Sequence, residues 1–149
     1  MKQDIIKITR EIVTKMGVEV SDIKEEEFTN TLFFDIQTKD GDFFTNRDGL
    51  TLRALNHVVG RMIFTKYPEP KNFTIDVNGY YKKHLEVIKQ KAKFAGDRAK
   101  SFKTNIDLEP MNSFERMIVH SVFAEENDIE THSDGYGAER HVVLSYKGE

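Results

Sequence analysis

The sequence predicts an α+β protein made of two small units. Apolar spacing places helices and strands in the order α-β-β-α-β-α and then β-α-β-β. The charge changes along the chain as well: residues 80–105 hold 8 Lys or Arg against 2 Asp or Glu, a balance of +6, whereas residues 106–149 hold 3 against 10, a balance of −7. We therefore expect one domain over residues 1–79 and another over residues 80–149, with a long basic helix over residues 80–100 at the junction.

The elements of the first domain follow from apolar spacing and turn residues. Ile5 and Ile12 belong to a helical repeat that ends at Gly17, which predicts a first helix. Leu52 and Ile63 belong to a second helical stripe. Between and after these helices the sequence predicts two strands, a turn and a third strand, over residues 18–27, 28–38, 39–42 and 73–77.

The second domain begins with the basic helix, whose apolar residues recur at helical spacing. A short strand follows, and Asn112 with Glu115 three residues later has the pattern of a capping box that starts another helix. That helix is expected to reach about Ala124. Two antiparallel strands around a Gly-rich turn end the chain, over residues 127–133 and 139–146.

Composition excludes several classes of protein. The 149 residues contain no cysteine, so disulfides, thiolate nucleophiles and cysteine zinc sites are absent, and a reducing cytoplasmic setting is compatible. No apolar run is long enough to cross a membrane, and the charged N-terminal residues do not resemble a signal peptide, so we expect no membrane insertion. The net charge of −3 argues against a strong, generic binder of polyanions.

Enzyme motifs are also missing. The sequence has no nucleophile elbow, no Walker loop and no H-E-x-x-H pattern, so we expect no catalytic residues and no cofactor. His120, His132, His141 and Asp134 could be imagined as metal ligands, because imidazole and carboxylate suit zinc or manganese. Exposed residues of an ordinary hairpin explain them more simply, and no metal site is predicted.

One motif in the last third has a recognisable spacing. Arg116 and His120 lie four residues apart, so they share a helix face, and seven residues stand in register over about 40 positions: Pro110, Glu115, Arg116, His120, Ser133, Gly135 and Arg140. This run resembles the R-three-H domain, a single-stranded nucleic-acid-binding fold named for its Arg-x-x-x-His. The resemblance implies a small α+β domain with a three-stranded antiparallel sheet.

The region upstream, residues 18–84, resembles a type II KH domain, which implies a three-stranded sheet with helices on one face. A KH domain joined to an R-three-H domain is similar to the bacterial Jag family of RNA-binding proteins. The resemblance implies RNA chaperoning, with a separate small KH protein as a further partner. Members of that family usually begin with another small N-terminal domain, which we do not expect in this chain.

The KH resemblance is imperfect at its phosphate-binding loop. The family pattern Gly-x-x-Gly is replaced by Asn46-Arg47-Asp48-Gly49. A glycine loop works because bare backbone approaches phosphates closely and the next helix offers unpaired N–H groups. Asp48 adds a negative charge beside the expected phosphate, and Arg47 partly offsets it, so a structural or protein-pairing KH unit remains an alternative.

The predicted function is binding of single-stranded RNA or single-stranded DNA, with the alternative of a protein-interaction module that has lost its nucleic acid. A guanidinium can fork onto a phosphate, and an imidazole can donate to a phosphate or stack on a base. Alternatively, Arg116 pairs with a carboxylate such as that of Glu115, Glu139 or Asp134. The expected contact residues are Arg116, His120, Arg140, Arg47, Gly49, Lys82, Lys89, Lys93 and Lys100. Stacking surfaces are expected from Tyr136, Phe123 or Phe102.

Overall fold

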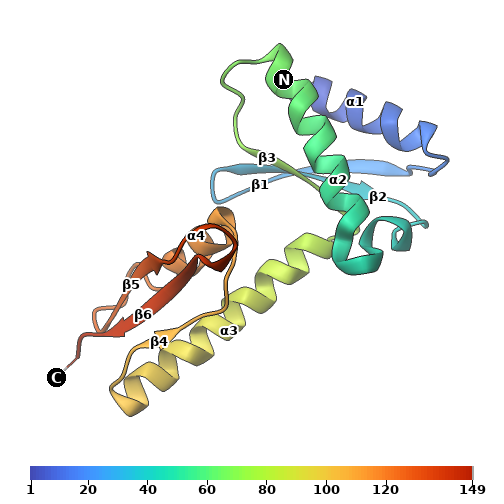
Figure 1. Cartoon of the computed structure of the whole chain (residues 1–149). Coiled ribbons are helices and arrows are strands. Elements are labelled where there is room, and N and C mark those ends of the chain that lie inside the picture. The colour runs from blue at the N-terminus through green and yellow to red at the C-terminus, as the bar shows by residue number, and fades with distance from the viewer. Residues whose placement is uncertain (149) are drawn as a thin grey trace. The chain divides into compact units, whose positions relative to one another are not determined.

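The computed structural model describes residues 1–148, and the chain divides into two compact units, Met1–Lys82 and Lys83–Glu149. Because α3 begins at Tyr80, its first three residues belong to the first unit and the rest to the second. In chain order the elements are α1 (Lys2–Lys15), β1 (Asp22–Phe28), β2 (Thr31–Gln37), α2 (Asp42–Lys66), β3 (Phe73–Val77), α3 (Tyr80–Phe102), β4 (Ile106–Asp107), α4 (Ser113–Val122), β5 (Ile129–Asp134), η1 (Gly137–Glu139) and β6 (His141–Tyr146) (Figure 1).

The first unit is a three-stranded mixed sheet with two helices on one face. β2 is the central strand, and it pairs with β1 in the antiparallel sense and with β3 in the parallel sense. Alternation along β2 points Leu32, Phe34 and Ile36 into a core shared with apolar residues of α1 and α2. Phe33 lies on the opposite face, where its ring contacts those of Phe28 and Tyr81.

Two polar side chains, Asn56 and Asp76, form hydrogen bonds to the backbone of β3 and of the first turn of α3. Asn56 of α2 donates to the Ile75 carbonyl at 2.8 Å and accepts from the Ile75 N–H at 2.7 Å, so it satisfies the outer edge of β3. The carboxylate of Asp76 is 1% exposed and accepts from the backbone N–H groups of Tyr81 and Lys82. These bonds fix the first turn of α3.

The second unit is a small antiparallel sheet packed against helices. The strand order is β4-β6-β5, and both pairings are antiparallel, as the resemblance to the R-three-H domain implied. Leu85 of α3, Ile118 of α4 and Leu144 of β6 are buried in its interior. The capping box at the start of α4 is confirmed, since Asn112 accepts from the Glu115 N–H at 2.9 Å and Glu115 accepts from the Asn112 N–H at 3.0 Å.

Several boundaries differ from those predicted. β1 begins at Asp22 rather than at residue 18. Val18 still belongs to the turn that follows α1, because its N–H donates to the Val13 carbonyl. β4 is only two residues long, because its pairing with β6 stops at Asp107. Across residues 1–148 none of the helices is both long enough and apolar enough to cross a membrane.

Candidate functional site

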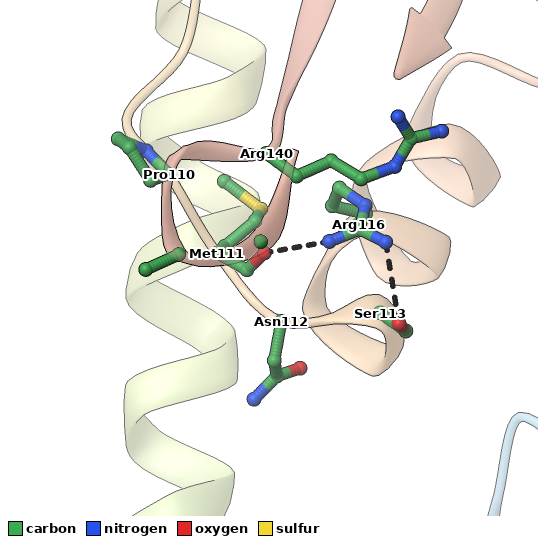
Figure 2. A pocket seen from close by; sticks show the side chains of 8 residues that line it. Pro110, Met111, Asn112, Ser113, Arg116 and Arg140 are labelled. Carbon is green, nitrogen blue, oxygen red and sulfur yellow. Dashed lines mark hydrogen bonds between the residues drawn. The ribbon is translucent and has the colours of Figure 1, made fainter. Parts of the chain in front are cut away.

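A hollow of about 510 Å³ lies beside the start of α4. It is lined by the chain leading into α4 (residues 110–113), by the η1 turn (residues 137–138) and by two arginines, Arg116 and Arg140 (Figure 2). In Figure 2 the side chains of Arg116 and Arg140, which both line this hollow, lie next to each other. The structure therefore brings together two of the three residues that the motif placed in one patch.

Arg116 extends from the first turn of α4 back toward the chain that precedes the helix. Its Nη1 donates to the Met111 carbonyl at 2.8 Å and its Nη2 donates to the Ser113 hydroxyl at 3.2 Å (Figure 2). Both acceptors are neutral. Over residues 1–148, no carboxylate forms an ion pair with Arg116, so the alternative in which this side chain pairs with an acidic neighbour is wrong. The Glu115 carboxylate lies instead at the capping box and 3.2 Å from His84 Nε2.

Arg140 precedes β6 and is held in the same way by a neutral acceptor. Its Nη1 donates to the Gly135 carbonyl at 2.8 Å, and its own carbonyl accepts from the Met111 N–H at 3.1 Å. Gly135 has φ +83°, and a Cβ there would lie 3.0 Å from the Glu139 carbonyl oxygen, so the turn requires glycine. A continuous set of hydrogen bonds thus joins the two arginines through Met111.

His120 lies outside this hollow and faces β5. Its Nδ1 is 2.7 Å from the Thr131 hydroxyl and its Nε2 is 3.2 Å from the Ser133 hydroxyl. Partial burial lowers the pKa of His120, and the positive charge of Arg116 and the proximity of His132 lower it further. A neutral imidazole with a hydroxyl at each nitrogen therefore ties α4 to β5. The motif located His120 and Ser133, but nothing in the sequence marked Thr131 as the second partner.

Two further predicted contact residues, Arg47 and Gly49, lie in the first unit at an interruption of α2. Asn46 is extended, and Arg47, Asp48 and Gly49 all have positive φ, at 54°, 55° and 75°. Gly49 is buried, and a Cβ on it would lie 3.0 Å from Tyr80 Cε1. This glycine is therefore needed for packing against Tyr80 as well as for its backbone conformation, whereas the Arg47 side chain is exposed.

Three of the four α3 lysines predicted to contact nucleic acid have acidic partners. Lys82 pairs with Glu26, and Lys89 lies 3.5 Å from Glu86. Lys100 pairs with Glu126 at 2.7 Å and with Asp128 at 3.5 Å.

Lys93 differs from these three lysines. It is exposed, and in the described part of the chain no acidic side chain pairs with it. Only Lys93 among the four predicted lysines thus presents a charge without an adjacent carboxylate.

The histidines of the hairpin do not gather into a metal site. His141 Nε2 lies 3.4 Å from Asp107, and its Nδ1 is 3.0 Å from the Glu139 carbonyl, whose hydrogen bond raises the pKa of His141 with help from the Asp107 charge. Between residues 1 and 148, no three His, Cys, Asp or Glu side chains are close enough together to hold a metal ion.

Comparison with known proteins agrees with the geometry of the second unit. The model of the R-three-H domain matches residues 85–146, which include both arginines of the hollow and His120. The match begins within α3 and ends at the last residue of β6.

Similarity to whole proteins extends beyond this domain. RNA-binding protein KhpB of Bacillus subtilis (strain 168) is 33% identical over 130 residues, covering 85% of this chain and 62% of that protein. RNA-binding protein KhpB of Clostridium symbiosum is 27% identical over 134 residues, covering 90% and 60%. This chain thus spans about three fifths of the length of these two relatives. The chain carries an R-three-H domain over residues 85–146, as its motif predicted, and over most of its length it is similar to the KhpB proteins.

Proposed function

We propose that this protein binds single-stranded nucleic acid, chiefly RNA, and that the hollow lined by Arg116 and Arg140 binds a phosphate group. The proposal rests on one observation. Arg116 and Arg140 line the same hollow, and the hydrogen-bond acceptors of both guanidinium groups are neutral. A guanidinium has five N–H donors. Arg116 uses two of these in the hydrogen bonds described and Arg140 uses one, so donors remain for phosphate oxygens.

The relatives support this proposal. Both are named RNA-binding proteins, and binding rather than catalysis is the activity that their names state. We propose the same for this chain, as a non-enzymatic protein that acts in the cytoplasm. A small separate KH protein remains a proposed partner, on the basis of the family resemblance.

For the first unit we propose a type II KH-like fold. Its two helices lie on one face of a three-stranded sheet, β2 and β3 are parallel, and α2 is interrupted where the KH phosphate loop would lie. In this proposal the Arg47 side chain, rather than bare glycine backbone, contacts a phosphate. His120 is proposed as a positioning residue that orients α4, since both of its ring nitrogens have hydroxyl partners.

The test is fluorescence anisotropy of the full chain with a short fluorescein-labelled poly-uridine RNA at about 50 mM and about 200 mM salt. We expect salt-dependent binding. Replacing both arginines, Arg116→Gln with Arg140→Gln, should weaken binding by at least about tenfold, because each charge-assisted hydrogen bond contributes roughly 1.5–3 kcal/mol. It should also reduce the magnitude of the log-log salt slope by about 0.7, because one phosphate is no longer bound.

A matched control is available on α3. Arg98 is an exposed arginine, and over residues 1–148 it forms no ion pair with an acidic side chain, so Arg98→Gln removes the same charge away from the hollow. Far-ultraviolet circular dichroism and a urea titration of each variant separate weaker binding from disrupted structure. Equal affinities of wild type and the double variant would show that the hollow does not bind phosphate.

A protein-interaction module is the second candidate, and two observations favour it. Lys82 and Lys100 are compensated by acidic side chains, and Asp48 places a carboxylate in the loop of the first unit. No RNA or DNA binding at about 50 mM salt, where phosphate contacts are strongest, would favour this candidate.

A further inference from the structure

The structure separates the three aromatic side chains that the sequence offered as stacking surfaces. Phe123 is only 6% exposed and belongs to the interior of the second unit. Phe102 is 70% exposed, but it is the last residue of α3 and is not part of the lining of the arginine hollow. Tyr136 is 92% exposed and stands immediately before Gly137, which lines that hollow.

The position of Tyr136 follows from the backbone of the turn. Successive Cα atoms are about 3.8 Å apart, so the Tyr136 Cα is one peptide unit from the rim of the hollow. The backbone there is fixed, because the Tyr136 carbonyl accepts from the Glu139 N–H at 3.2 Å and the preceding Gly135 carbonyl accepts from Arg140. The backbone that carries the Tyr136 ring thus belongs to the same turn that holds the Arg140 guanidinium.

The ring itself has no role in holding this turn together. Over residues 1–148, the Tyr136 side chain makes no hydrogen bond and no ring contact, and its exposure leaves the aromatic faces open to solvent. A single exposed aromatic residue needs no explanation by itself. What distinguishes Tyr136 from exposed aromatics such as Phe94 is its place in the chain, next to Gly137, which lines the same hollow as Arg116 and Arg140.

We infer, on the basis of the proposed function, that Tyr136 is a base-stacking residue: the hollow between Arg116 and Arg140 holds a phosphate, and an unpaired base of the same strand stacks on the Tyr136 ring. Stacking suits every base because each has a π-face, so this subsite would bind with little sequence preference. It would also select single strands, because the bases of a duplex are already stacked on their neighbours.

Alanine substitution tests the subsite in the full chain. With the labelled poly-uridine RNA, Tyr136→Ala should weaken binding by roughly 5-fold or more, as alanine substitution of stacking aromatics does, whereas Tyr136→Phe should bind like wild type. Phe94→Ala, which removes an exposed aromatic from α3, is the matched control and should also bind like wild type. A strand of the same length with abasic positions should bind wild type and Tyr136→Ala equally, because it offers phosphates without bases.

A spectroscopic measurement reports the stacking directly. The chain contains no tryptophan, so Tyr136→Trp introduces a single indole. Its fluorescence should be quenched by the poly-uridine RNA and remain unchanged with the abasic strand, while Phe94→Trp should show no quenching with either.

Failure of this inference is distinguishable from failure of the proposed function. If wild type binds RNA through Arg116 and Arg140 while Tyr136→Ala binds equally well, the stacking subsite is wrong and the phosphate site stands. If wild type binds no single-stranded RNA or DNA, both are wrong.

Discussion

The two units each place an arginine near the beginning of a helical segment, but they do so by different means. In the first unit, Arg47 lies in a break of α2 where three consecutive residues have positive φ. In the second unit, Arg116 lies in the first turn of α4, behind a regular N-cap at Asn112 with φ −72° and ψ 171°. A helix start can thus offer an anion either its backbone or its side chains.

At α4 the backbone is already occupied. The capping box uses the N–H groups of Asn112 and Glu115, and the Glu115 carboxylate brings a negative charge to the helix start. An anion is therefore not expected to bind there through the helix backbone in the way that P-loops bind phosphate. In the proposed site, phosphate would instead bind to the guanidinium groups of Arg116 and Arg140, whose hydrogen-bond acceptors are neutral.

At the break in α2 the backbone is strained. Arg47 and Asp48 are L-residues in left-handed conformation, which costs roughly 1–2 kcal/mol for each ordinary residue and less for Asp. These two strained residues immediately precede Gly49, which packs against Tyr80. In the proposed KH-like first unit, the phosphate-binding loop would keep its backbone path with changed charges, whereas the proposed site of the second unit would bind through charge.

The largest expected effect comes from the turn that supports Arg140. Gly135→Ala should lower the free energy of unfolding by about 2 kcal/mol, because alanine is disfavoured at φ +83° and its Cβ would lie 3.0 Å from the Glu139 carbonyl. RNA affinity should fall as well, since the carbonyl that holds Arg140 would move. Urea denaturation and anisotropy measure the two effects.

Gly137→Ala is the control for that substitution. Gly137 also has positive φ, at +59°, but a Cβ there meets nothing within 4 Å, so only the conformational cost of about 1 kcal/mol is expected. Equal destabilisation of the two variants would contradict the proposed role of the close approach at Gly135.

The next effect concerns the attachment of α4. His120→Ala removes hydrogen bonds to Thr131 and Ser133 and should cost about 1–2 kcal/mol near pH 7.5, with a smaller effect on RNA affinity than the removal of the two arginines. An RNA affinity that falls as far as in the double arginine variant would mean that His120 contacts the nucleic acid itself.

The same histidine should make stability depend on pH. Because the folded state lowers the pKa of His120, the unfolded chain binds the proton more readily, and stability is present above the ordinary value near 6.5 and lost as the pH falls through it. His141 has the opposite sign, since its pKa is raised. Urea titrations at about pH 7.5 and about pH 5.5 should therefore show a smaller loss of stability in His120→Ala, and a larger loss in His141→Asn, than in wild type.

A smaller effect is expected at the break in α2. Asp48→Asn removes one negative charge, and asparagine tolerates the left-handed conformation. If Arg47 contacts phosphate, RNA affinity should rise about 2- to 5-fold, the size of a surface charge interaction of below about 1 kcal/mol. Asp42→Asn, an exposed charge change in the first turn of the same helix, is the control. An unchanged affinity in Asp48→Asn would argue that the first unit serves structure or protein pairing.

Local chemistry explains which features could be predicted from the sequence. The capping box was predictable because Asn112 and Glu115 bond to each other across a single turn. The antiparallel hairpin of β5 and β6 was predictable because its turn residues and alternation are local. By contrast, the acceptor of Arg116 is the backbone carbonyl of Met111, and a carbonyl leaves no signal in the sequence.

Longer-range contacts account for the rest. The separation of His120 from the arginine hollow depends on its hydroxyl partners across the sheet, and residue spacing on one helix cannot show such partners. The basic block of α3 was visible as a charge balance, but the pairing of two of its lysines with acids far along the chain, Lys82 with Glu26 and Lys100 with Glu126, was not. Spacing thus located the motif residues, and only packing showed which of them face the hollow.

The smallest expected effect distinguishes an unpaired lysine from a paired one on α3. Lys93→Gln removes a charge without an acidic partner in the described chain, so it should weaken RNA binding slightly, by about 2-fold at about 50 mM salt, and the difference should fade at about 200 mM because screening shortens the reach of surface charges. Lys100→Gln removes a charge that Glu126 and Asp128 compensate. In Lys100→Gln these two carboxylates lose their positive partner and would repel a nearby nucleic-acid strand. If the RNA passes close to them, Lys100→Gln should weaken binding as much as Lys93→Gln does. If the RNA instead follows only the hollow at α4, Lys100→Gln should leave affinity unchanged, and anisotropy of the two variants side by side decides between these paths.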